Sequence, residues 1–155
     1  SKVTTYDYDY TRGGMITKVT DPLNNKREYD YDTNGFMRSD LVKRNSDQAV
    51  IFQTTFEYDL VGNLGKVTDG EGRVTTTNFD DLNRMLNSTD PANTTITYGY
   101  DENGNNTSVT DILGRQWTAG YDKKNRLETA TDPLERLSRW QYDTEDQLFK
   151  IISPS

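Results

Sequence analysis

The sequence predicts an all-β protein made of tandem 21-residue β-hairpin repeats that form an elongated antiparallel β-meander or solenoid strip. Three observations predict this class. An aromatic residue followed by aspartate recurs at a spacing of 21 residues, and glycine or asparagine recurs four positions after the aromatic residue. Aromatic and polar residues also alternate just before it, which is the period of a strand.

Seven aromatic residues define the repeats. With each taken as position zero, the successive spacings are 21, 27, 21, 21, 21 and 21 residues, so one repeat carries a six-residue insertion within residues 39–52. We expect residues 1–155 to form a single array of seven repeats and to be a piece of a longer protein. The seven anchor residues are Tyr10, Tyr31, Tyr58, Phe79, Tyr100, Tyr121 and Tyr142.

The first strand of each repeat ends at the anchor. Position −2 is also aromatic in five repeats, with Thr77 and Ala119 as the departures, so this strand has an aromatic face. We expect the aromatic side chains of one repeat to stack on those of the next. A fully buried anchor such as Tyr121 would then contribute roughly 3–5 kcal/mol to the free energy of unfolding.

A tight turn follows the anchor. Aspartate at position +1 accepts hydrogen bonds from backbone two residues on, and glycine, asparagine or aspartate at +4 tolerates positive φ. Thr11 is the exception at +1. The aspartates are Asp32, Asp59, Asp80, Asp101, Asp122 and Asp143, and the glycines of the clearest turns are Gly35, Gly62 and Gly104.

The second strand carries apolar residues at positions +6 and +9, with Asn106 and Asp40 among the departures. These positions differ in parity and cannot share one face of a regular strand, so we expect a β-bulge or a turn that reaches +6. A second turn, of the type Asp-Pro-x-Asn/Gly, spans +11 to +14, and Glu135 departs from it at +14. The insertion predicts a longer projecting hairpin or, alternatively, a loop that binds a partner.

Composition excludes most enzyme chemistry. The chain has no histidine and no cysteine, which removes Ser/His/Asp and Cys/His arrangements, zinc sites built on these residues and disulfides. A formal charge of −7 argues against a nucleic-acid partner, and no apolar run approaches the length of a membrane span.

The recurring carboxylates could in principle form a catalytic pair or a calcium site instead of turns. The aspartates recur in every repeat, whereas a catalytic pair is unique within a domain, so we expect no catalytic activity. Asp101, Asn103 and Asn105 match positions 1, 3 and 5 of a calcium loop, but Asn106 and Ile112 stand where glycine and glutamate are needed. We therefore expect no cofactor and no metal site.

The motif Tyr-x-Tyr-Asp-x-x-Gly-x-Leu is clearest in residues 56–64, 27–37 and 97–105. It resembles the YD repeat of the Rhs family, which bacterial Rhs proteins share with the shell components of Tc toxins and with the teneurins. The resemblance implies a long β-strip that winds into a hollow shell, which in the bacterial members encloses a C-terminal toxin polypeptide.

The expected function follows from that resemblance. The chain would be a structural wall segment of a larger Rhs-type protein, secreted or on the cell surface of a bacterium, with flanking repeats and a toxin cargo as partners. A carbohydrate- or cell-surface-binding repeat module is the alternative, because exposed aromatic residues can also stack on sugar rings. The exposed edge strands additionally allow an edge-paired homodimer.

Overall fold

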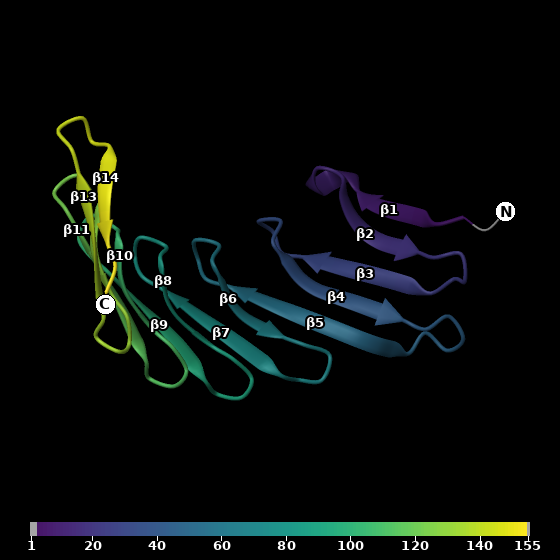
Figure 1. Ribbon diagram of the computed structural model, residues 1–155. Helices are drawn as coiled ribbons and strands as arrows, with labels where there is room; N and C mark the ends of the chain where they lie inside the picture. The colour runs from purple at the N-terminus through teal and green to yellow at the C-terminus, as the bar shows by residue number, and fades with distance from the viewer. Residues whose placement is uncertain (1–2, 155) are drawn as a thin grey trace. The chain divides into compact units, whose positions relative to one another are not determined.

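The computed structural model describes residues 3–154, in which an all-β architecture is present, as the sequence predicts (Figure 1). No helix in these residues has the length and apolar character needed to cross a membrane. One turn of 3-10 helix, η1 (Tyr10–Arg12), accompanies the strands. The strands are β1 (Thr5–Asp9), β2 (Met15–Thr20), β3 (Lys26–Tyr31), β4 (Met37–Lys43), β5 (Val50–Tyr58), β6 (Leu64–Thr68), β7 (Val74–Phe79), β8 (Met85–Thr89), β9 (Thr95–Tyr100), β10 (Asn106–Thr110), β11 (Gln116–Tyr121), β12 (Leu127–Thr131), β13 (Leu137–Tyr142) and β14 (Leu148–Ile152).

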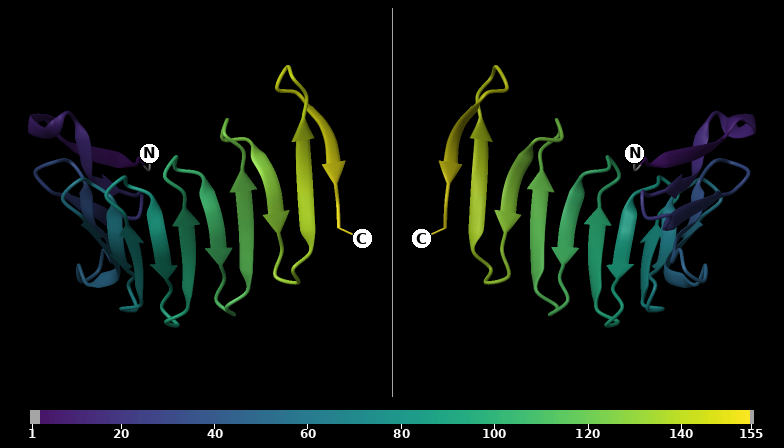
Figure 2. Two further views of the ribbon diagram at one scale, coloured as in Figure 1. Left: turned by 90° about the vertical axis from the view of Figure 1, so that its left-hand side faces the viewer. Right: turned by 90° about the vertical axis from the view of Figure 1, so that its right-hand side faces the viewer.

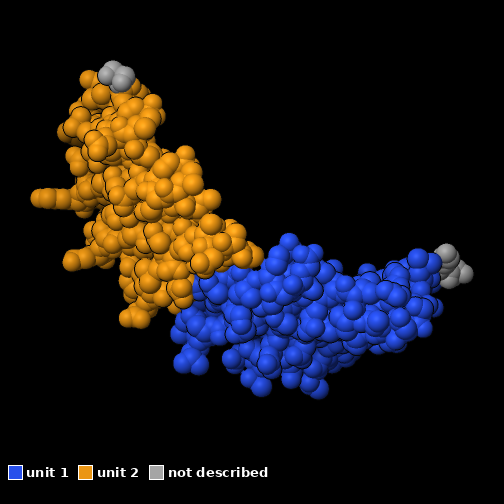
Figure 3. Space-filling view, turned by 90° about the horizontal axis from the view of Figure 1, so that it is seen from below, with its two compact units in different colours: residues 1–77 blue, residues 78–155 orange. Residues whose placement is uncertain are grey.

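The chain divides into two compact units, residues 1–77 and 78–155, which are coloured separately in Figure 3. In the first unit, each strand from β1 to β7 pairs antiparallel with the next along the chain. β4 and β5 are the two longest strands, and the backbone N–H of Arg44 donates to the carbonyl of Ala49 across the turn between them, at 3.0 Å. The sequence insertion thus lies in this extended hairpin.

The second unit repeats the same topology. Its strands β8 to β14 pair antiparallel in chain order, and Figure 2 shows them side by side. The predicted antiparallel meander is therefore confirmed in both units. Since consecutive strands pair only with their neighbours, contacts pass from each repeat to the next.

A β-bulge accounts for the spacing of the apolar positions. Tyr121 pairs with Leu127, but Gly120 pairs with Thr129, so Glu128 has no partner in the ladder. The unpaired residue brings positions +6 and +9 to the face of the anchor, which confirms the predicted bulge. The same irregularity leaves one residue unpaired in five of the other repeats: Thr17, Arg38, Gly65, Thr107 and Phe149.

The sheet has two unlike faces and no closed core. The anchors, position −2 and positions +6 and +9 lie on an aromatic face, and the opposite face carries mainly threonine and charged residues. No apolar side chain in residues 3–154 is fully buried. Tyr121 is half-buried, so the expectation of a fully buried anchor is wrong: a single layer of sheet covers each ring from one side only.

The first repeat differs from the others at its turn. Thr11 replaces the usual aspartate at +1, and Asp9 accepts the backbone N–H of Thr11 at 2.9 Å instead. The turn consequently begins two residues early, and its closing bond runs from the N–H of Gly14 to the carbonyl of Asp9. Tyr10 leaves the strand, enters η1 and is 81% exposed.

Candidate functional site

The most regular feature of the molecule is the carboxylate that closes each turn. Oδ1 of Asp122 accepts the backbone N–H groups of Lys124 and Arg126 at 2.8 and 3.0 Å, and its Oδ2 accepts Nε of Arg126 at 2.7 Å. Two backbone hydrogen bonds of 2.9 Å complete the turn. The N–H of Asp122 donates to the carbonyl of Arg126, and the N–H of Asn125 donates to the carbonyl of Asp122. One aspartate therefore satisfies most of the polar groups of its own turn.

The same arrangement recurs in both kinds of turn. The residue four positions after the aspartate donates to its carboxylate twice, from the backbone N–H and from a side-chain nitrogen. The distance from the side-chain nitrogen to the carboxylate oxygen is 2.7–2.9 Å. The sequence analysis missed this partner position, although an Asp-x-x-x-Arg/Asn spacing signals it. The other pairs are Asp21–Asn25, Asp59–Asn63, Asp69–Arg73, Asp80–Arg84, Asp101–Asn105, Asp111–Arg115 and Asp132–Arg136.

These donors stabilise the charged form of each carboxylate. In most turns the hydrogen bond from the side chain four residues on is the largest cause that holds the pKa below its usual value, and backbone N–H groups add to it. In Asp80 the backbone N–H of Arg84 contributes most. The pKa is lowered for the same reasons in Asp21, Asp59, Asp69, Asp101 and Asp111.

The last residue of each turn has left-handed backbone geometry. Gly35, Gly62 and Gly104 have φ of 89°, 97° and 90°, a conformation that costs glycine little. Glu135 holds the equivalent position of the second turn with φ of 61°, although its side chain disfavours that region. Both turns expected from the sequence are thus present.

Replacing Glu135 with glycine is expected to raise the free energy of unfolding by about 1 kcal/mol, because the strain of a left-handed non-glycine residue is removed. Urea denaturation monitored by circular dichroism measures the change. Gly114→Ala is the matched opposite, since Gly114 has φ of 75° and an added Cβ meets nothing within 4 Å. It should lower stability through backbone strain alone. Equal stability of all three proteins would contradict the interpretation.

Four of the anchors form a hydrogen bond to the repeat before them. Tyr31, Tyr58, Phe79, Tyr100, Tyr121 and Tyr142 are each the last residue of a strand, followed directly by the turn aspartates. The hydroxyl of Tyr121 donates to the carbonyl of Asn106, fifteen residues earlier, at 3.0 Å. Equivalent bonds of 2.9–3.0 Å run from Tyr31 to Ile16, from Tyr100 to Met85 and from Tyr142 to Leu127.

The ring of an anchor also contacts the preceding turn. Phe36 stacks on Tyr58 with ring centroids 5.0 Å apart. In the second unit a guanidinium replaces the aromatic ring: Arg84 lies 4.6 Å from the ring centroid of Tyr100, and Arg126 lies 4.2 Å from that of Tyr142. The expected stacking of aromatic on aromatic therefore holds for Tyr58, whereas Tyr100 and Tyr142 use cation–π contacts.

Removing one inter-repeat hydrogen bond should have a measurable cost. Tyr121→Phe keeps the ring but leaves the Asn106 carbonyl without its donor, so we expect a loss of about 1 kcal/mol in thermal or urea unfolding. Tyr10→Phe is the control, because Tyr10 is exposed and its hydroxyl makes no hydrogen bond within residues 3–154. Identical stability of the two variants would show that the hydroxyl bond does not join the repeats.

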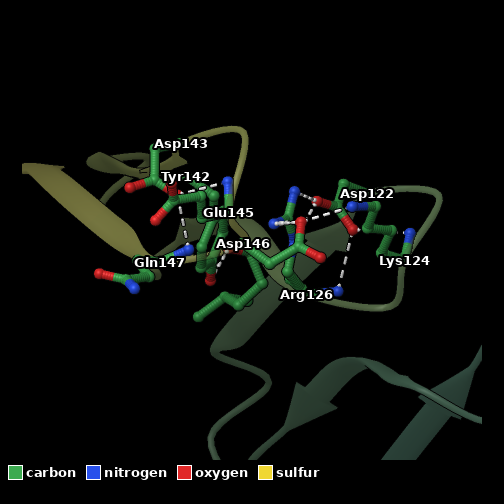
Figure 4. A network of polar contacts seen from close by, with 9 residues as sticks. Asp122, Lys124, Arg126, Tyr142, Asp143, Glu145, Asp146 and Gln147 are labelled. Atoms are coloured by element: carbon green, nitrogen blue, oxygen red, sulfur yellow. Dashed lines mark hydrogen bonds and ion pairs between the residues drawn. The ribbon is translucent and has the colours of Figure 1, made fainter.

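The last two turns after an anchor are coupled by charge (Figure 4). Asp146 accepts hydrogen bonds from Nζ of Lys124 and, at 2.7 Å, from Nη1 of Arg126 in the preceding repeat. The pKa of Asp146 is lowered, first by the hydrogen bond from Lys124. Asp143 accepts the backbone N–H groups of Glu145 and Gln147 in its own turn.

This chemistry is structural. The turn carboxylates are engaged by N–H donors, and both oxygens of Asp101 accept hydrogen bonds from Asn103 and Asn105. No group of three acidic side chains within residues 3–154 is placed to hold a metal ion. What these residues do is close turns and hold neighbouring repeats together.

Known proteins share this sequence pattern and fold. Residues 79–116 and 100–136 match a family model described as RHS Repeat. No curated protein matches the chain. The crystal structure of TcdB2-TccC3-Cdc42 is similar over 97% of the chain, with a TM-score of 0.69 and 20% identity, and that of TcdB2-TccC3 without its hypervariable C-terminal region over 98%, with the same score and identity. A mutant Tc holotoxin pore from Photorhabdus luminescens aligns over 96% with a TM-score of 0.56 and 15% identity. The chain spans only 9%, 9% and 11% of these three chains.

Proposed function

The chain is a YD/Rhs repeat protein, and from this premise we propose that it forms one stretch of the wall of a larger Rhs-type protein that encloses or presents a toxin polypeptide. Its role in that wall is structural. We propose that the anchor, aspartate and glycine residues singled out in the sequence close the turns and join the repeats, and we assign no catalytic role to any of them.

One observation carries this proposal. In four repeats the hydroxyl of the anchor donates to a carbonyl fifteen residues earlier, which ties each of these repeats to the one before it. Such a design extends a sheet by addition of identical units, and we propose that the seven repeats form a single array within a longer one. Flanking repeats are then the first partners of this segment, and a toxin segment of the parent protein is the second.

The similar solved structures support the proposal at the level of fold. Nearly all of this chain aligns within a small part of the much larger chains in the TcdB2-TccC3-Cdc42 and Tc holotoxin pore structures. A wall of this kind acts outside the cell that makes it, so we propose a secreted or cell-surface bacterial protein.

The proposal is tested by limited proteolysis of the parent protein produced from its complete reading frame. We expect a non-repeat C-terminal segment to resist protease while the repeats are intact, and to be digested after the repeats are unfolded in acid. A C-terminal segment that is cleaved at the same rate in both states would overturn enclosure.

A further inference from the structure

A row of three small side chains interrupts the aromatic face of the second unit. Ala119 on β11 pairs with Ala130 on β12, which pairs in turn with Ser138 on β13. In the preceding repeat the corresponding row is Tyr98, Val109 and Trp117. The three small residues therefore leave open a space that large side chains fill one repeat earlier.

That space is a groove of about 350 Å³ on the surface of the second unit. Trp117 lies two residues before Ala119 on β11 and Tyr121 two residues after it, so the two rings stand at either side of the small residue. Leu127 and Val109 add apolar surface. A groove of this volume, lined by aromatic and aliphatic groups with a few polar ones, is typical of a small-ligand site.

Two of the side-chain oxygens that line the groove have no protein partner in residues 3–154. The hydroxyl of Ser138 and the side-chain oxygen of Asn106 make no hydrogen bond with any residue in the described part of the chain; the amide nitrogen of Asn106 donates to the carbonyl of Gly99. Asp132 and Arg136 stand at the rim and neutralise one another through a bond of 2.7 Å. The groove thus offers hydrogen bonds without net charge.

These features define the chemistry of an occupant. A flat aromatic wall suits a ring with an apolar C–H face. Trp117 is 40% exposed, and because the guanidinium of Arg115 lies 5.7 Å from its ring centroid, only the opposite ring face is available for such packing. Free hydroxyl and amide oxygens favour an occupant that bears hydroxyl groups over a purely apolar side chain, which would leave them unpaired. The internal ion pair disfavours a charged ligand.

We infer that the groove over Ala119, Ala130 and Ser138 binds one uncharged six-membered sugar ring of a glucan, stacked on Trp117 and hydrogen-bonded by Ser138 and Asn106. The site does not depend on the wall function proposed above. It lies on one face of a single unit and needs neither flanking repeats nor a cargo.

Titration of the 155-residue chain with cellotetraose tests the site, with Trp117 fluorescence followed in a Trp140→Phe background so that one tryptophan reports. Ala119→Tyr fills the groove with tyrosine, the residue found at position −2 in several other repeats, and should weaken binding roughly tenfold or more. Thr77→Tyr places the same residue at position −2 of a repeat without the groove, and this variant should bind cellotetraose as tightly as the protein that carries Trp140→Phe alone. Ser138→Ala should weaken binding several-fold without a change in volume.

Two results would overturn the inference. One is the absence of a saturable fluorescence change with cellotetraose at millimolar concentration. If the aromatic peptide Gly-Tyr-Gly then gives such a change, the groove is assigned to polypeptide instead. The other is unchanged affinity in an Ala119→Tyr protein whose circular dichroism shows that it is folded. Wall formation by the parent protein would stand in either case.

Discussion

Lowering the pH below about 4 is expected to unfold the repeats progressively, because the turn carboxylates must then be protonated. In the folded chain the pKa values of aspartates such as Asp122 and Asp132 lie below the ordinary value, chiefly because of the side chain four residues on. Their stabilisation is fully present above the unfolded pKa, and it is lost as the pH falls toward the folded pKa. Many turns share this property, so the losses add.

Urea unfolding at a series of pH values between 7 and 2 measures the effect. The midpoint should hold above pH 5 and fall steeply below about pH 4. Asp132→Asn should flatten the pH dependence, while Asp81→Asn, which removes an exposed carboxylate without a side-chain hydrogen bond in the described residues, should leave the slope as it is. A midpoint that does not change down to pH 3 would contradict the role of the carboxylates.

Replacing Asp40 with alanine is expected to lower the free energy of unfolding by about 2 kcal/mol. Asp40 is 7% exposed and lies on the aromatic face, where Arg27 donates to both its carboxylate oxygens, from Nε at 2.8 Å and from Nη2. The variant leaves the guanidinium without its partner. The cost stays below that of a fully buried pair because the Arg27 side chain is 53% exposed.

A double-mutant cycle isolates this pair. Asp40→Val introduces the residue found at the same position in Val19 and Val67, and Arg27→Thr matches Thr75 at its own position. We expect the double variant to lose less stability than the sum of the losses in the two single variants. The difference, which is the coupling free energy of the pair, should be about 1 kcal/mol or more. Additive effects, measured by urea unfolding, would show that the two departures from the repeat pattern are independent.

Much of the fold is predictable because it is dictated locally. Aspartate at +1 with glycine or asparagine at +4 determines a turn by backbone geometry alone, and the odd separation of +6 and +9 requires the bulge that leaves Glu128 unpaired. The start of the first turn at Asp9 follows from the same chemistry, since Thr11 cannot replace the carboxylate.

The rest depends on contacts that form only after pairing. Arginine and asparagine serve equally as donors to the turn carboxylate, so the partner column at Asn105 and Arg126 looks variable in the sequence. The partial exposure of Tyr121 follows from a single-layer sheet, which the composition does not reveal. The groove arises from pairing between Ala119 and Ala130, and in the sequence Ala119 is only a missing aromatic residue.

The central claim is that this chain is one stretch of a continuous wall. Electron cryo-microscopy of the parent protein, produced from its complete reading frame, tests it most directly. The account predicts that residues 1–155 lie within a closed β-shell, continuous with further 21-residue repeats, with polypeptide density inside. A free array at the end of the chain, beside an anchoring or catalytic domain and with no enclosed density, would contradict it.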